Sequence, residues 1–175
     1  MQRESAVTYP ADAPDKPGRD VVFEQGFPRP GGFGKLVAAK LQPPDEMPNE
    51  DYPFILTTGR QLEHWHTGAM TRRATTLDAL EPSAVASVSR GTIAKLGIKP
   101  GDPIRVSTRR GVVELAARQD DAIPDGVVFI PFAFVEAAAN ILTNPALDPF
   151  GKIPEFKYCA ARVEAIDPAT KVAAE

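Results

Sequence analysis

The stretch from Thr57 to Arg73 combines residue types that bind anions. It holds both histidines of the chain, its only tryptophan, three arginines, four threonines and two glycines. Guanidinium groups, hydroxyls and glycine backbone amides together suit a ligand rich in phosphate oxygens and hydrogen-bonding ring edges. The run before it, residues 52–56, is apolar and predicts a buried strand. The sequence therefore indicates an anion-binding loop that leaves the end of a strand.

Two other interpretations of this loop stay open. The first is a surface loop whose arginines are solvated and whose tryptophan, Trp65, packs over the core. The second is a zinc site, because His64 and His66 lie two residues apart. The chain has no third histidine and only one cysteine, so the other zinc ligands would have to be carboxylates.

Composition limits the class of protein. A chain of 175 residues with 43% apolar content has room for one domain with a core and an appendage. No apolar run approaches the roughly 20 residues that span a membrane, and the N-terminal residues hold no secretory signal, so we expect a cytoplasmic protein without a membrane partner. The net charge of −3, with acids and bases mixed, argues against nucleic acid as a partner. Cys159, the single cysteine, excludes an internal disulfide or a cysteine-bound iron–sulfur cluster.

Residues 1–50 differ from the rest of the chain. They hold eight of the 18 prolines, and residues 31–34 add three glycines. Proline at this density forbids a long helix and removes sheet donors, so an extended, partly disordered connector that lies on something larger is expected. A disordered tail is the alternative. Within this segment, residues 21–23 and 35–37 are predicted as short strands.

Many short strands follow, with one short helix among them. Ser89 is expected to cap the helix, and Gly97 to end it in a left-handed conformation. This pattern predicts a mainly β fold, a small closed barrel with helical inserts, and the helix–turn–strand element at 93–106 recurs in double-psi β-barrels. The predicted strands cover residues 52–56, 84–88, 104–108, 112–117, 127–132 and 156–166. The predicted parts of the chain are the connector at 1–50, the barrel domain at 51–167 and a flexible tail at 168–175.

A second polar cluster covers residues 136–145. Asn140 and Asn144 carry donors and acceptors that suit the edge of a purine or pterin ring. Turn chemistry is the alternative role, above all for Asn144, which precedes a proline. Lys157, at the start of the last predicted strand, is either solvated or a partner for a phosphate or ring carbonyl.

Together these segments resemble one enzyme family. Residues 52–73, 131–132 with 137–149, and 152–160 are similar, in order and spacing, to the C-terminal domain of the molybdenum or tungsten formate dehydrogenase catalytic subunit. The resemblance extends over about residues 20–167 and is greatest to the cytoplasmic NAD-dependent enzymes. The segments His64–Gly68 and Met70–Arg73 also resemble periplasmic nitrate reductase.

The resemblance implies a double-psi β-barrel that closes over a pair of molybdopterin guanine dinucleotides. It implies three groups of cofactor-binding residues: Thr58, Gly59, Arg60, Gln61 and Leu62 along one dinucleotide; His64, His66, Thr67, Met70 and Thr71 on the pterin and phosphate side; and Phe132, Asn140, Phe156 and Lys157 completing the pocket. Amides and arginine suit a pyrophosphate, and a pterin requires fixed amide-type partners in a dry slot.

The resemblance also implies partners. Such a catalytic subunit is several times longer than this chain. It carries cysteines that bind an iron–sulfur cluster, a cysteine or selenocysteine that binds the metal, and a histidine and an arginine beside formate. None of these residues is identifiable in this sequence. Cys159 is interpreted as a buried thiol. We therefore expect a split subunit or excised domain that holds no catalytic or metal-binding residue of its own, binds the cofactor weakly alone, and works with the rest of the subunit and its electron-transfer subunits.

Four other functions are alternatives to this one. A nitrate-reductase-type enzyme would use the same domain. A non-catalytic carrier of the molybdenum cofactor would need only the binding loop. An interaction module, such as an ATPase adaptor, would leave the arginine-rich loop unexplained. A self-processing decarboxylase needs a Gly-Ser bond, which does not occur in the sequence.

Overall fold

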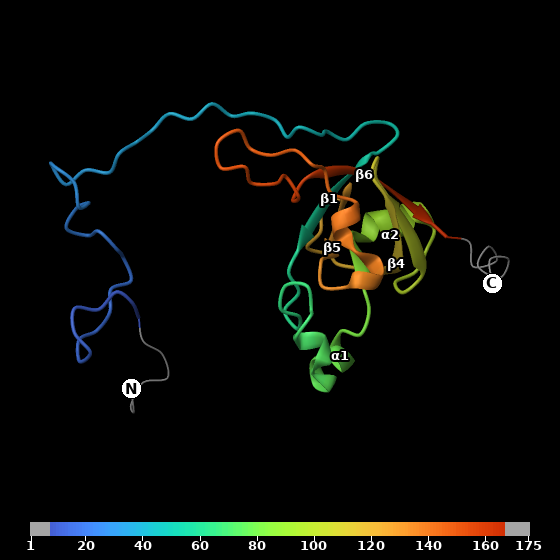
Figure 1. Cartoon of the computed structure of the whole chain (residues 1–175), viewed down its shortest axis with the longest axis horizontal. Coiled ribbons are helices and arrows are strands. Elements are labelled where there is room, and N and C mark those ends of the chain that lie inside the picture. Colours follow the sequence, from blue (N-terminus) through green and yellow to red (C-terminus); the bar gives the residue numbers. More distant parts are fainter. Residues whose placement is uncertain (1–7, 167–175) are drawn as a thin grey trace. The chain divides into compact units, whose positions relative to one another are not determined.

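The computed structural model describes residues 8–166, and the described chain divides between Gln42 and Pro43 into two compact units (Figure 1). The N-terminal unit contains no helix or strand among residues 8–42. The strands expected at 21–23 and 35–37 are therefore wrong. Neither short apolar run finds a partner strand, because prolines and positive-φ glycines such as Gly31 and Gly32 turn the chain between them. The tail expected at 168–175 lies outside the described residues.

The second unit is built from six strands that close into a barrel (Figure 1). The order around the barrel is β1, β5, β2, β4, β3 and β6. Pairs β1–β5 and β2–β4 are parallel, and the other neighbours are antiparallel. This interleaved topology is the predicted double-psi β-barrel. The strands are β1 (Phe54–Gly59), β2 (Val85–Val88), β3 (Pro103–Ser107), β4 (Val112–Gln119), β5 (Val127–Pro131) and β6 (Cys159–Ala165).

The barrel is filled by apolar side chains that alternate along the strands. Ile104 and Val106 of β3 are fully buried, whereas Arg105 between them is exposed. In β5, Val128 and Ile130 are fully buried, as expected for a strand with neighbours on both sides. Burial at about 25 cal/mol per Å² of apolar surface is the main stabilising term for such a core. The six predicted strand regions agree with the observed ones to within a few residues.

Helix α2 (Arg90–Leu96) follows β2 and ends where the sequence predicts. The Ser89 hydroxyl accepts a hydrogen bond from the Thr92 amide at 3.0 Å, and it also contacts the Asp125 carboxylate. Gly97 ends the helix at φ 67°, a left-handed conformation that glycine adopts without steric cost. The turn that follows leads into β3. This element therefore connects β2 to β3, the two strands that lie on either side of β4 in the barrel.

Ser89→Ala is expected to lower the free energy of unfolding by about 1–2 kcal/mol, because the buried cap leaves the Thr92 amide without an acceptor. Urea denaturation followed by circular dichroism measures this change. Ser83→Ala, at an exposed position outside any helix, is the matched control and should change stability by less than about 0.5 kcal/mol. Equal effects of the two substitutions would contradict the capping role.

The loops that carry polar residues leave the barrel at one place. Gly59 at the end of β1 lies beside Pro131 at the end of the parallel strand β5, so the segments that follow both strands begin side by side. The loop after β1 holds a 3-10 helix (Thr71–Arg73) and α1 (Thr75–Leu80). The loop after β5 holds 3-10 helices Val135–Ala137 and Ala139–Ile141. In residues 8–166 no helix has the length and apolar character to cross a membrane.

Candidate cofactor-binding cleft

A cleft of about 500 Å³ opens where three chain segments meet. The loops after β1 and β5 form two sides, and the segment leading into β6, which pairs antiparallel with β1, forms the third. The lining residues are Arg60, His66, Thr67, Phe132, Asn140, Thr143, Pro154, Phe156 and Lys157. Seven of these nine residues are in the predicted binding set, so the structure brings together residues separated by up to 97 positions (157 − 60).

The cleft lining combines positive charge with aromatic surface. Its two cationic side chains are Arg60 and Lys157, and its lining includes no carboxylate. Lys157 donates a hydrogen bond through Nζ to the Thr58 carbonyl at 2.7 Å, with the ammonium 5.7 Å from the centroid of the Phe156 ring. No ion pair in the described part of the chain involves Arg60. The site therefore has uncompensated positive charge next to flat apolar surface.

His66 reaches the cleft through an unusual backbone conformation. Its φ of 50° is positive, in the left-handed region that non-glycine residues seldom adopt. Its ring lies 6.4 Å from Phe132, nearly parallel at 30°, and meets Trp65 edge-on at 4.6 Å. A strained residue of this kind persists where the surroundings fix it, and such residues gather at binding sites.

Thr58 and Gly59, at the end of β1, are not among the residues that line the cleft, but they contact residues that do. The Thr58 hydroxyl donates to the Phe156 carbonyl at 2.8 Å, and this bond holds the third segment against β1. A Cβ atom at Gly59 would lie 2.6 Å from Cε2 of Phe129 and 3.8 Å from Nζ of Lys157. A side chain at Gly59 would therefore displace the Phe129 ring of the neighbouring strand β5, which explains why a glycine stands there.

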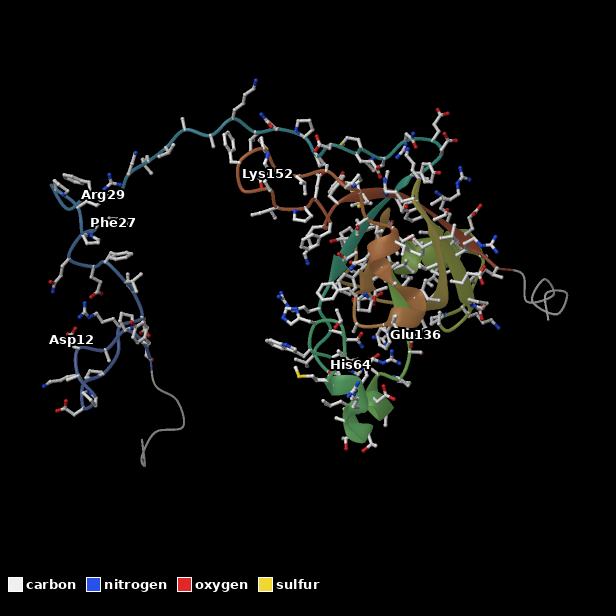
Figure 2. The ribbon with its side chains drawn as sticks, in the orientation of Figure 1. Asp12, Phe27, Arg29, His64, Glu136 and Lys152 are labelled. Atoms are coloured by element: carbon white, nitrogen blue, oxygen red, sulfur yellow. The ribbon has the colours of Figure 1, made fainter. Side chains whose placement is uncertain are left out.

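Neither His64 nor Thr71 lines the cleft, and His64 is buried within the loop after β1 (Figure 2). His64 is 1% exposed, with Nε2 2.7 Å from the Glu81 carbonyl and Nδ1 3.3 Å from the Thr71 hydroxyl. The same hydroxyl accepts a hydrogen bond from the Trp65 amide at 3.0 Å. Both residues thus hold the loop in shape, whereas the resemblance places them along the ligand.

The other predicted residues of this loop are also absent from the cleft lining. Leu62 is 95% exposed and Met70 is 68% exposed. Gln61 has both carboxamide atoms buried, and neither makes a hydrogen bond of acceptable geometry in the described structure. It lies close enough to Glu81 to add to the lowering of that carboxyl's pKa, for which the Arg118 guanidinium is the main cause.

Two lining residues, Thr143 and Pro154, were not predicted. Thr143 lies inside the predicted polar cluster at 136–145, and its hydroxyl donates to the Asn140 carbonyl at 3.0 Å. A polar side chain between two asparagines is a pattern from which Thr143 could have been predicted to line the cleft. Pro154 carries no polar side-chain group, and nothing in its sequence context distinguishes it from the other prolines.

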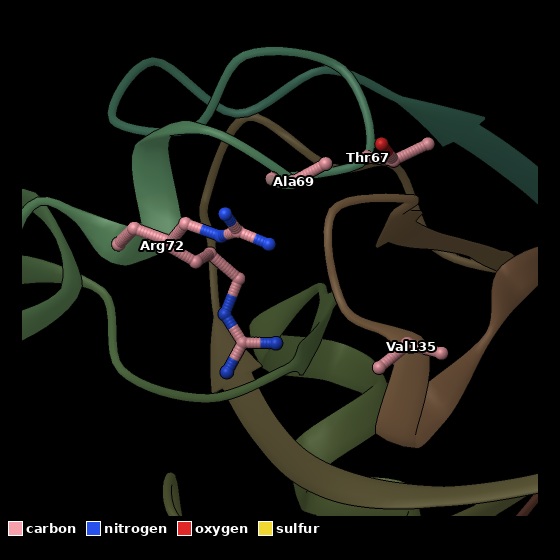
Figure 3. Close-up of a pocket in the computed structure, with 6 residues that line it drawn as sticks. Thr67, Ala69, Arg72 and Val135 are labelled. Atoms are coloured by element: carbon pink, nitrogen blue, oxygen red, sulfur yellow. The ribbon is translucent and has the colours of Figure 1, made fainter.

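A second hollow of about 450 Å³ adjoins the cleft, and Thr67 lines both (Figure 3). Arg72 and Arg73 from the 3-10 helix form one side, with Val135 from the loop after β5 on the other. Arg72 pairs with Glu136 at 2.7 Å and so ties the two loops together. This pair lowers the pKa of Glu136, because the guanidinium stabilises the ionised carboxylate.

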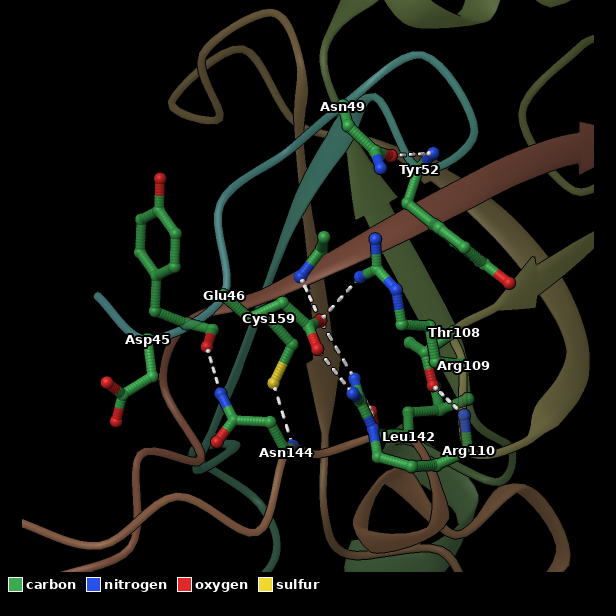
Figure 4. Close-up of polar contacts among 12 residues, drawn as sticks. Asp45, Glu46, Asn49, Tyr52, Thr108, Arg109, Arg110, Leu142, Asn144 and Cys159 are labelled. Carbon is green, nitrogen blue, oxygen red and sulfur yellow. Dashed lines mark hydrogen bonds and ion pairs between the residues drawn. The ribbon is translucent and has the colours of Figure 1, made fainter. Parts of the chain in front are cut away.

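Behind the cleft, a network of polar contacts surrounds Cys159 (Figure 4). Cys159 is fully buried, as predicted, and its sulfur accepts from the Asn144 amide at 3.2 Å. Burial raises the pKa of this thiol. Asn144 lies outside the cleft lining, and its Oδ1 accepts a hydrogen bond from the Ala146 amide at 2.9 Å, which is the turn chemistry anticipated as its alternative role. Its Nδ2 also donates to the Tyr158 carbonyl at 3.0 Å. Among residues 8–166 no three histidines, cysteines or acids are grouped so that they could hold a metal ion.

Comparison with known proteins identifies the family. The family model described as "Molydopterin dinucleotide binding domain" matches residues 54–160, which span β1 to the start of β6 and contain every residue lining the cleft. The chain belongs to this family. The barrel and its converging loops thus form a molybdopterin dinucleotide-binding domain.

Curated relatives of this domain include alpha subunits of formate dehydrogenases and a periplasmic nitrate reductase. The chain is 44% identical over 158 residues to F420-dependent formate dehydrogenase 1 subunit alpha of Methanococcus maripaludis, covering 90% of this chain and 23% of that protein. The corresponding protein of Methanocaldococcus jannaschii is 40% identical over 160 residues, covering 91% and 24%. Periplasmic nitrate reductase of Desulfovibrio desulfuricans is 32% identical over 178 residues, covering 93% and 24%. The chain therefore spans about a quarter of these relatives.

Among solved structures, acetylene hydratase from Pelobacter acetylenicus has the same fold. The two chains superpose with a TM-score of 0.61 at 22% identity, over 67% of this chain and 19% of that one. At this identity the similarity concerns the fold alone. The domain is thus a barrel that several larger proteins contain.

Proposed function

We propose that the cleft binds the nucleotide part of a molybdopterin guanine dinucleotide. The single observation that carries the proposal is the convergence of Arg60, His66, Asn140 and Lys157 on one opening. An arginine that forms no ion pair within residues 8–166 supplies a forked donor for phosphate oxygens, and an asparagine side chain supplies a donor and an acceptor for a base edge. The family match supports a dinucleotide of molybdopterin, and the guanine form is part of the proposal.

The residues present fit such a group. The cleft volume of about 500 Å³ lies in the range of small-molecule sites, roughly 300–1,000 Å³. The lining holds two cations and no carboxylate, so a pyrophosphate meets no repulsive charge. Phe132 and Phe156 offer flat apolar faces for a ring system.

In the proposed enzyme, the bound group supplies the metal centre at which the substrate reacts, and this chain supplies binding. Arg60 and Lys157 neutralise phosphate charge, and Phe132 and Phe156 exclude water from the ring. His66 and Asn140 orient the ring through hydrogen bonds. None of these residues is assigned a proton-transfer step, in keeping with the expectation that the chain alone is not catalytic.

We further propose that the domain serves a formate dehydrogenase that oxidises formate to carbon dioxide. The support is the identity of 40–44% to formate dehydrogenase alpha subunits, compared with 32% to periplasmic nitrate reductase, which is the second candidate. The partners would be the other parts of a catalytic subunit and its electron-transfer subunits, with molybdenum or tungsten on the cofactor. A cytoplasmic location and the division at 1–50, 51–167 and 168–175 belong to the same proposal.

The electron acceptor is open to direct assay. The resemblance favours NAD, whereas three relatives are named for F420.

Purification of the tagged protein from its native source tests the proposal. The bound subunits, the metal content and the nucleotide released by acid are then identified. We expect co-purifying oxidoreductase subunits, molybdenum or tungsten, guanosine monophosphate and formate oxidation with one of these acceptors. A preparation with nitrate reduction and no formate oxidation would support the second candidate, and one without metal or nucleotide would contradict cofactor binding.

A further inference from the structure

The wall of the cleft that carries Asn140 and Thr143 has little regular structure of its own. It belongs to the part of the loop after β5 that begins with the 3-10 helix Ala139–Ile141, and it lies outside the barrel strands. Loops of this kind open more easily than the strands they connect. A precise binding site on such a loop requires contacts that fix it from behind.

Arg110 makes that contact from the turn between β3 and β4. Its Nε and Nη2 atoms donate hydrogen bonds to the Leu142 carbonyl at 3.1 and 2.9 Å. Leu142 lies between the two lining residues, with its side chain fully buried. The turn also approaches the loop closely, because a Cβ atom at Gly111 would lie 2.9 Å from the Ile141 carbonyl. Two bonds to one oxygen therefore fix the middle of the loop.

Arg110 is itself held by Glu46, a residue 64 positions earlier in the chain (Figure 4). Its guanidinium forms two hydrogen bonds to the carboxylate, one of them at 3.0 Å between Nη2 and Oε1. The same Oε1 atom accepts from the Ala160 amide of β6 at 2.8 Å. Both side chains are largely shielded from solvent, with Glu46 15% and Arg110 23% exposed. The pair therefore forms a fixed support between β6 and the loop.

We propose that Arg110 is a positioning residue for nucleotide binding. Through the Leu142 carbonyl it holds Asn140 and Thr143 toward the cleft, and Glu46 holds Arg110 in the required orientation. Arg110 does not line the cleft, so it acts through the loop and not by contact with a ligand. This inference rests on the proposed function, since it assumes that Asn140 meets a nucleotide.

The test uses the full chain and guanosine diphosphate as the probe. Arg110→Met is expected to weaken binding by about 10-fold, as for other residues that support a site from behind. Arg110→Lys, which keeps the charge but loses the paired donors, should weaken it nearly as much. Arg105→Met is the matched control, because Arg105 is on the same hairpin and pairs with Glu114 at 2.7 Å away from the loop; it should leave affinity unchanged.

Two readouts separate positioning from a loss of stability. Amide exchange of Ile141 and Leu142 should accelerate in Arg110→Met at temperatures where the barrel amides stay protected. Combining Arg110→Met with Asn140→Ala should cost less affinity than the sum of the two single losses, because both substitutions weaken the interaction that Asn140 makes. A lower melting temperature with unchanged affinity in Arg110→Met, or fully additive losses in the double variant, would overturn the positioning role. Failure of the wild-type chain to bind would instead overturn the proposed cleft, and the inference with it.

Discussion

Arg60→Ala should weaken binding of guanosine diphosphate by about 30-fold, or about 2 kcal/mol, the amount expected when the charged partner of a phosphate is removed. Arg60 lines the cleft and forms no ion pair within residues 8–166, so its guanidinium is available to a ligand. Isothermal titration of both chains at low and moderate salt measures the loss. The difference should shrink as salt rises, because phosphate contacts at an open cleft are screened.

The control for this measurement is Arg90→Ala. Arg90 begins α2, its side chain is 76% exposed, and it is not among the residues lining the cleft. Its removal changes net charge by the same amount as the loss of Arg60. If the two variants lost equal affinity, the effect would be one of general charge and the role of Arg60 would be refuted.

Glu46→Ala is expected to lower the free energy of unfolding by about 2–3 kcal/mol, because it leaves Arg110 without its carboxylate and the Ala160 amide without its acceptor. Chemical denaturation measures this change. Glu114→Ala removes an exposed pair with Arg105 and should cost less than about 1 kcal/mol. Comparable losses in the two variants would show that the buried network contributes no more than a surface ion pair.

The same carboxylate makes stability depend on pH. Hydrogen bonds from Arg110 hold the pKa of Glu46 below its ordinary value of 4.5. A carboxyl whose pKa is lower in the folded chain stabilises the fold fully above its unfolded pKa, and this contribution is lost as pH falls through the folded pKa. In Glu46→Gln the free energy of unfolding should therefore decrease less steeply below pH 4.5 than in the wild type. An unchanged dependence of this free energy on pH would contradict the role of the Glu46 carboxylate.

Local patterns in the sequence predicted most of the fold. Alternation of buried and exposed residues, as in Ile104 to Val106, identifies strands because successive side chains point to opposite faces. Ser89 and Gly97 marked the ends of α2, since their roles depend on neighbours a few residues away. Seven of the fourteen residues implied by the resemblance line the cleft, because a resemblance supplies long-range information that local patterns lack.

What the sequence did not predict depends on contacts between distant segments. His64 has the residue type of a ligand-binding group, yet its ring nitrogens contact Thr71 and the Glu81 carbonyl. The pairing of Glu46 with Arg110 joins residues 64 positions apart, and neither neighbourhood indicates the other. Residues 21–23 and 35–37 have residue types that favour strands, but they form none. Strand formation requires a neighbouring strand, and neither segment pairs with one.

The central claim is that one cleft at the end of β1 and β5 receives the nucleotide. Titration of the isotopically labelled chain with guanosine diphosphate, followed by nuclear magnetic resonance, tests it directly. We predict that signals of Arg60, His66, Asn140 and Lys157 shift together and fit one dissociation constant, while those of α2 stay in place. Shifts that scatter over the barrel surface, or that saturate at different concentrations for these four residues, would contradict the account.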